Sequence, residues 1–474
     1  MRATRREFFV GMLASAGVSG CAGLAGAGAA PRLRFGVVSD IHVTTPESTD
    51  RFRAALRYFR SRGADAVVVA GDLSDWGLKS GLRYVADAWR DEMSGAGVVP
   101  LFCTGNHDYD GWWYGDMTLD MHLQGYSEAE SLNQGNMKSV WESTFGEPFA
   151  AVRRRTVKGY DFVSAEWQDS AGRTSENEAA EWLRAHAGEL GAGGRPFFFF
   201  RHDVIPGTVA SSEDRPSALR DALSLFPNGV AFCGHTHWPL TDERSIWQGG
   251  FTAVSIPSMS YTALPAGYDN GDDRRNGKSE MGMRMLPLRE NYEQPQGYFV
   301  SVYDGRVVVE RHDFGEGEDI AAPWDVCLRG RSYSFAERSR LAPVPQFAPG
   351  ARVGMHVVNG STRNDRWTIF MRLEFPAAKA SQGRAFDYEV RVEDGSGRPV
   401  AAKRFLTPTF HRAVWRDADR LSFDFDGWAL PESGPVRFAV YPRNCFGVAG
   451  RPAYSPYLDP KPGRAEARRA AKKG

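Results

Sequence analysis

Five short apolar runs in the first two thirds of the chain all end in polar residues. The runs are LRFGVVSD (33–40), ADAVVVAGD (64–72), VVPLFCTGNHD (98–108), PFFFFRHD (196–203) and GVAFCGHTH (229–237). Amphipathic stretches lie between several of them, as in 50–63, where Phe52, Leu56 and Phe59 share one helical face. Strands that alternate with helices predict an α/β core with buried strands, and ligands bind beyond the strand ends of such sheets.

The polar residues at these strand ends are of types that bind metal ions. They are Asp40, His42, Asp72, Asn106, His202, His235 and His237. The members of the pairs Asp40/His42 and His235/His237 are two residues apart, and on an extended backbone such residues point to the same side. We therefore expect each pair to reach one ion. Mixed carboxylate and imidazole ligands suit Zn, Mn or Fe. Any one of these residues could merely satisfy strand-end backbone groups, but chance does not supply five such strand ends in one domain.

The ordered motifs SDIH, GDLSD, GNHD, a single histidine after a strand, and GHTH resemble those of the calcineurin-like metallophosphoesterases over roughly residues 33–310. The resemblance implies a four-layer αββα fold with two divalent or trivalent metal ions, Mn, Fe or Zn. It implies that Asp40, His42, Asp72 and His237 hold one ion, and that Asp72, Asn106, His202 and His235 hold the other. Asp72 would bridge the ions. His107 would be the acid that serves the leaving group, oriented by Asp108.

The chemistry of such a site points to phosphate-ester hydrolysis. Two neighbouring ions lower the pKa of a shared water, so that a metal-bridged hydroxide can attack phosphorus. A histidine near its working pKa can protonate the leaving group. Asp75 stands where purple acid phosphatases carry a tyrosine, which argues against that subgroup, and GDLSDWG resembles the phosphodiesterase branch that includes cyclic-nucleotide enzymes. We expect a phosphodiesterase. The alternatives are a phosphomonoesterase and, in another class, a non-catalytic surface- or glycan-binding protein.

The sequence pattern changes after about Pro343. Alternating segments such as FDYEVRVED (386–394) and VRFAVYPRN (436–444) predict an antiparallel β-sandwich, and Phe438–Gly447 faintly resembles part of a fibronectin type III module. We therefore divide the chain into four parts. Residues 1–30 are an export signal with a linker, and residues 31–342 are a metallophosphoesterase domain. Residues 343–459 are a β-sandwich that could contact a surface or a glycan, and residues 460–474 are a basic disordered tail.

The first thirty residues have the build of an export signal, with a basic start, an apolar stretch and then small residues. TRREFF (4–9) resembles a twin-arginine signal, and VSGC (18–21) resembles a lipoprotein box in which Cys21 would be acylated. Cleavage near Ala27–Ala29 is the alternative. We expect a bacterial periplasmic protein or membrane-anchored lipoprotein. Lys+Arg and Asp+Glu are both 58, so charge gives no argument for nucleic-acid binding.

The export signal can be tested directly. Replacing Arg5→Lys together with Arg6→Lys should leave the protein in the cytoplasm, because the twin-arginine route recognises the arginine pair. Cell fractionation measures this, and unchanged export of the double variant would mean that the signal is of another type. Mass spectrometry of the mature N-terminus would separate an acylated Cys21 from a start near Ala30.

Overall fold

The computed structural model describes most of the chain. The described residues are 30–109, 130–167, 173–264, 268, 284–285, 294–328, 333–361, 367–381, 384–426, 430–431 and 434–460. The expected export signal with Cys21 and nearly all of the basic tail lie outside these ranges. No helix within them is long and apolar enough to cross a membrane.

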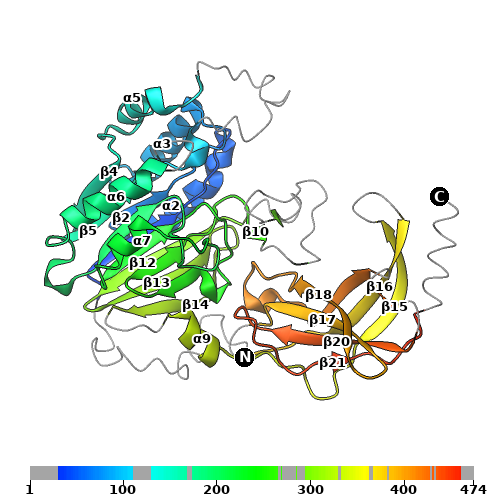
Figure 1. The fold of residues 1–474 in the computed structure, drawn as a ribbon. Helices are drawn as coiled ribbons and strands as arrows, with labels where there is room; N and C mark the ends of the chain where they lie inside the picture. Colours follow the sequence, from blue (N-terminus) through cyan, green and yellow to red (C-terminus); the bar gives the residue numbers. More distant parts are fainter. Residues whose placement is uncertain are drawn as a thin grey trace, which may run out of the picture.

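Two six-stranded sheets form the larger part of the molecule (Figure 1). The first has the order β14-β13-β12-β1-β2-β3, in which β1, β2 and β3 are parallel. Its strands are β1 (Leu33–Val38), β2 (Ala66–Ala70), β3 (Val99–Cys103), β12 (Gln296–Tyr303), β13 (Arg306–Asp313) and β14 (Glu318–Cys327). The second has the order β4-β5-β6-β7-β9-β8, in which β5, β6, β7 and β9 are parallel. Its strands are β4 (Val152–Val157), β5 (Tyr160–Ala165), β6 (Phe197–Arg201), β7 (Gly229–Cys233), β8 (Ile246–Gln248) and β9 (Thr252–Ser255).

The two sheets pack face to face and helices cover their outer faces. Phe35 lies 5.1 Å from Phe162 and 4.7 Å from Phe198, measured between ring centroids, in the core between the sheets. One set of helices packs on the first sheet and another on the second. The first set is α2 (Asp50–Ser61), α3 (Lys79–Met93) and α5 (Gln134–Phe145), and the second is α6 (Arg173–Ala185) and α7 (Ala218–Leu223). This arrangement confirms the predicted four-layer αββα fold.

The layers explain why the motif strands are apolar throughout. In β6, Phe198 and Phe200 face the other sheet, whereas Phe197 and Phe199 face the helices. A strand that is buried on both faces reads as a continuous apolar run rather than an alternating one. The five motifs therefore follow strands that are fixed from both sides.

Two smaller antiparallel sheets follow and form the predicted β-sandwich. Their orders are β15-β16-β19 and β18-β17-β20-β21. The strands are β15 (Gly354–Ser361), β16 (Trp367–Pro376), β17 (Asp387–Asp394), β18 (Pro399–Leu406), β19 (Arg420–Asp426), β20 (Val436–Arg443) and β21 (Ala453–Tyr454). Alternate residues such as Tyr388 and Val390 of β17 pack with Phe423 of β19 in one core between the sheets. The boundary at 342/343 stays a prediction.

Several short elements complete the described structure. They are β10 (Ala263–Leu264), β11 (Arg284–Met285), α9 (Phe335–Leu341) and the 3₁₀ turns η1 (Glu47–Thr49), η2 (Asn106–Asp108), η5 (Ala192–Gly194), η6 (Glu243–Ser245) and η8 (Val414–Arg416). Cys103 and Cys233, each at the end of a motif strand, are buried free thiols.

Candidate metal centre

The motif residues leave their strands in an unusual backbone conformation. Five of the six non-glycine residues with positive φ in the described structure belong to the predicted site. They are Asp40 (55°), His42 (50°), Asp72 (51°), His235 (69°) and His237 (49°). Our expectation of an extended backbone at the two pairs was therefore wrong, since β1 has already ended at Val38. Left-handed residues of this type cost about 1–3 kcal/mol each and cluster where function requires them.

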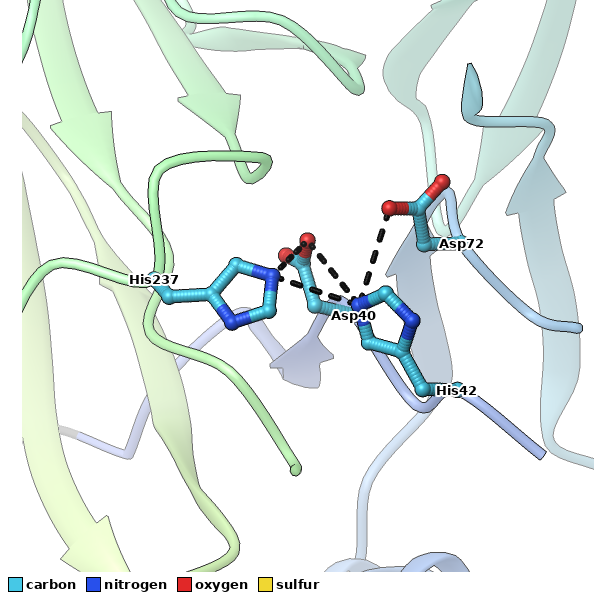
Figure 2. Close-up of side chains that lie close together, drawn as sticks. All are labelled: Asp40, His42, Asp72 and His237. Atoms are coloured by element: carbon cyan, nitrogen blue, oxygen red, sulfur yellow. Dashed lines mark hydrogen bonds and ion pairs between the residues drawn. The ribbon is translucent and has the colours of Figure 1, made fainter. Parts of the chain in front are cut away.

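Four of these side chains converge in a first group, Asp40, His42, Asp72 and His237 (Figure 2). The Nε2 atoms of His42 and His237 are 3.2 Å apart. Nε2 of His237 lies 3.0 Å from Oδ1 of Asp40, and Nε2 of His42 lies 3.7 Å from Oδ2 of Asp72. All four residues are buried, so the two imidazoles and two carboxylates face one point away from water.

A second group lies beside the first and shares Asp72 with it. Nε2 of His202 is 3.0 Å from Oδ2 of Asp72 and 3.0 Å from Oδ1 of Asn106. Nδ1 of His235 is 3.2 Å from the same His202 nitrogen. The structure thus brings together all seven residues that the sequence suggested as ligands, in two groups that meet at one carboxylate.

In three of the histidine rings, the nitrogen that points away from the cluster, Nδ1, donates a hydrogen bond to an oxygen atom. The pairs are His42 Nδ1 with Asp75 Oδ1 at 2.7 Å, His202 Nδ1 with the Ala70 carbonyl at 2.9 Å, and His237 Nδ1 with the Tyr261 carbonyl at 2.9 Å. Because these oxygens accept, each neutral ring carries its proton on Nδ1 and directs the lone pair of Nε2 into the cluster. Lone pairs and carboxylates that face one another repel unless a cation lies between them. The donor set therefore fits metal ions that take nitrogen and oxygen ligands.

The charges of the cluster follow from burial and mutual contact. Burial alone would raise the pKa of Asp40, but His237 and His202 lower it to about 2. Burial lowers the pKa of His42 and of His235. Burial would also lower the pKa of His202, but Asp72 and Asp40 raise it to about 10. An ion that binds His202 therefore has to displace a proton from this ring.

His107 lies at the edge of the cluster and is held by Asp75. Its backbone N–H donates to Oδ1 of Asp72 at 2.8 Å, and its Nδ1 lies 2.8 Å from the Asp75 carbonyl oxygen. The His107 side chain is 20% exposed, whereas that of His42 is 2% exposed. The His107 ring therefore lies in a position that reaches solvent.

Asp108 has another role than the predicted one. Its carboxylate accepts hydrogen bonds from the backbone N–H groups of Leu73 at 3.2 Å, Ser74 at 2.7 Å and Gly105 at 2.8 Å. Asp108 thus ties the loop after β3 to the loop after β2, and Asp75 is the residue that orients His107. The sequence signal for the role of Asp75 is its position three residues after Asp72. We compared that position only with the tyrosine of purple acid phosphatases, and this comparison does not reveal that Asp75 orients His107.

A glycine directly precedes Asp72, Asn106 and His235, and its lack of a side chain lets neighbouring residues come close to the backbone. A Cβ atom on Gly71 would lie 2.5 Å from the His202 ring, and one on Gly105 would lie 2.3 Å from Oδ1 of Asp72. A Cβ atom on Gly234 would lie 2.6 Å from Oδ2 of Asp40. Real Cβ atoms do not come this close to other heavy atoms, so these glycines belong to the site although they carry no chemistry.

Residues 33–239 match the family model for calcineurin-like phosphoesterases. This part of the chain is similar to a calcineurin-like metallophosphoesterase domain, and that family binds a dinuclear metal site. No curated protein matches the chain.

Several solved structures are similar to part of the chain at low identity. A dimetal phosphatase from Danio rerio is 11% identical with a TM-score of 0.37, over 63% of this chain and 99% of that one. GAP50, the anchor in the inner membrane complex of Plasmodium, is 13% identical with a TM-score of 0.37, over 64% and 90%. The purple acid phosphatase PPD1 from yellow lupin (Lupinus luteus) is 14% identical with a TM-score of 0.41, over 64% and 56%. We draw no function from these similarities.

The shared carboxylate gives the first prediction for the site. Asp72→Asn should lose most of the bound metal, because an amide supplies no charge to either group. We expect the affinity to fall by more than the roughly 10–100-fold that is typical when an outer partner of a ligand is removed. Metal content after dialysis against a weak chelator measures this. Asp161→Asn, which changes a carboxylate on β5 that pairs with Arg154, is the matched control. Full metal content in Asp72→Asn would refute the assignment.

Proposed function

We propose that this protein is an exported, metal-dependent phosphoester hydrolase that acts on phosphodiesters. The observation that supports it best is the pair of ligand groups joined at Asp72, since Oδ2 of this residue faces both His42 and His202. Metal ions bound there would polarise the phosphoryl group and activate a water molecule. Six of the seven ligands are buried and would limit the access of bulk water to the ions, and His107 would lie at the edge that reaches solvent.

His107 is the group that we assign to proton transfer. Its Nδ1 proton is held by the Asp75 carbonyl, so that Nε2 is the ring atom that can give a proton to a leaving-group oxygen. The ring lies against His42, with 4.7 Å between centroids, and its backbone N–H is fixed on Asp72. Both contacts place the acid next to the first ligand group.

The preference for a diester over a monoester rests on the sequence, because GDLSDWG (71–77) resembles the phosphodiesterase branch. Asp75 lies 2.7 Å from Nδ1 of His42, and Oδ1 of Asp203 lies 3.8 Å from Nε2 of His235. These carboxylates add negative charge to that of Asp40 and Asp72, although Arg201 pairs with Asp203 at 2.6 Å. The positive charge of two bound ions would offset this negative charge, so the charge of the site favours neither substrate class. A phosphomonoesterase stays the alternative.

A non-catalytic binding protein is the alternative of another class. Binding alone would not require an acid held at the edge of the metal ligands, and His107 is held there by two hydrogen bonds. We therefore favour the enzyme. Export to the periplasm, with or without a lipid on Cys21, is a further part of the proposal and rests on the sequence of the first thirty residues.

A substrate panel tests the proposed activity. The purified protein, supplied with Mn, Zn or Fe, should hydrolyse bis(p-nitrophenyl) phosphate with a kcat/KM at least about tenfold above that for p-nitrophenyl phosphate, which corresponds to about 1.4 kcal/mol of discrimination. Cyclic nucleotides belong in the same panel, and metal-depleted protein is the control. A preference for the monoester would indicate a phosphomonoesterase. Two bound ions without any turnover would favour the binding protein.

The role of His107 makes a separate prediction. His107→Ala should retain both ions and lose about 10²–10⁴-fold in rate on esters with alkoxide leaving groups, which need a proton. The loss on nitrophenyl esters should be small, because nitrophenolate leaves without one. His186→Ala, at a ring that stacks on Trp182, is the control. An equal loss on both kinds of ester would show that His107 is not the acid.

A further inference from the structure

His237 is presented by two loops that follow β7 and β9. The Tyr261 carbonyl accepts from Nδ1 of His237 at 2.9 Å, and the Ala263 N–H donates to the His237 carbonyl at 2.9 Å. On the other side, the Nε1 atom of Trp238 donates to Oδ2 of Asp242 at 2.9 Å. Asp242 is fully buried. The direction of the His237 ring therefore depends on the segments 238–245 and 258–264.

The first segment contacts the C-terminal β-sandwich. The Thr241 hydroxyl donates to the Phe410 carbonyl, and the guanidinium carbon of Arg244 lies 5.6 Å from the centroid of the Phe386 ring. The β-sandwich also contacts Tyr268, whose hydroxyl donates to Oδ2 of Asp387 at 2.8 Å. The side chains Tyr268, Phe386, Leu406 and Phe410 form one buried apolar cluster across this interface.

The part of the β-sandwich that meets these loops is itself firmly held. Arg384 donates to the carbonyls of Thr409 and Arg412, on either side of Phe410. Gln296 of β12 donates to the His411 carbonyl at 3.0 Å, which ties the same segment to the first sheet. Phe410 is 1% exposed. The segment 407–412 is therefore a fixed support rather than a mobile connection.

We infer that the C-terminal β-sandwich is a positioning part of the metal centre, because it holds segment 238–245, which follows His237 and helps to direct its Nε2 into the first ligand group. This inference rests on the proposed dinuclear site. It gives the domain a role inside the protein, in addition to the surface or glycan contact suggested by its sequence. Ligands held by well-supported neighbours keep the geometry that metal binding needs, and loss of such support weakens binding.

The two ligand groups should differ in their dependence on this support. The second group comprises Asp72, Asn106, His202 and His235, which follow β2, β3, β6 and β7 directly. None of these four residues comes from 237–268. Loosening the contact between the β-sandwich and the loop after His237 should therefore weaken the binding of one ion and leave the binding of the other nearly unchanged. A general loss of stability would weaken the binding of both ions.

Calorimetric titration of the metal-depleted full chain with Co²⁺ tests the inference. Wild type should show two binding events. Phe410→Ala should weaken one of them by about 10–100-fold, and Thr241→Val, which removes only the hydroxyl that bonds the Phe410 carbonyl, should do so to a smaller degree. Phe410→Leu should restore most of the affinity. The absorption bands of bound Co²⁺ should report a changed ligand field for the affected ion alone.

The matched control lies in the same interface but away from the His237 loops. Arg416 pairs with Glu318 at 2.6 Å and with Glu316 at 2.8 Å, near the turn between β13 and β14. Arg416→Ala should leave both metal-binding events within about threefold of wild type, since it removes two partly exposed ion pairs. Circular dichroism and melting curves establish that each variant is folded. If Phe410→Ala does not fold, Thr241→Val and Tyr268→Phe carry the test.

The outcomes separate the inference from the proposed function. If wild type binds two ions and the interface variants bind both as tightly, the inference is wrong and the dinuclear site stands. If the variants weaken both events equally, the domain supports the fold in general and the inference is wrong again. If wild type itself does not bind two ions, the proposed function fails and the inference fails with it.

Discussion

The carboxylate of Asp72 is the contact on which the rest of the site depends. Oδ2 faces His42 at 3.7 Å and His202 at 3.0 Å, and Oδ1 accepts from the His107 backbone at 2.8 Å. One side chain thus touches the first ligand group, the second ligand group and the proposed acid. For this to occur, the ends of β1, β2 and β3 in one sheet must meet those of β6 and β7 in the other. The face-to-face packing of two sheets, with helices outside, produces that meeting.

Such a cluster works against stability when no cation is present. Carboxylates and imidazoles that have left water and face one another carry a desolvation penalty of several kcal/mol per ion. The left-handed backbone at the five ligand positions adds a further cost. The apolar core between the sheets, where Phe35, Phe162 and Phe198 are buried, offsets this cost because each large side chain contributes about 1.5–3 kcal/mol. Metal binding then stabilises the folded state further, since the unfolded chain offers no such site.

The sequence predicts the layers and the ligand types well, for physical reasons. Apolar runs such as Phe197–Phe200 are typical of strands that are covered on both faces, and the alternation in 386–394 is typical of a strand with one covered face. The sequence could not predict the left-handed turns at Asp40 and His42, because that conformation is stabilised by backbone contacts with another strand end: the His42 N–H donates to the Asp72 carbonyl at 3.0 Å. The roles of Asp75 and Asp108 likewise depend on tertiary contacts. Gly71, Gly105 and Gly234, in contrast, mark in the sequence the positions where neighbouring side chains come close to the backbone.

The contact between the two parts of the chain was also beyond the sequence pattern. Thr241 and Phe410 are 169 positions apart, and neither belongs to a recognisable motif. We infer from their contact that the two ligand groups are held by different means. The second group follows strand ends that both neighbouring layers fix, so its geometry is a property of the αββα fold alone. The first group takes His237 from loops that have little regular structure of their own and that lie against Phe386, Leu406 and Phe410. We infer that the four layers position the second group by themselves, whereas the first group also depends on the β-sandwich.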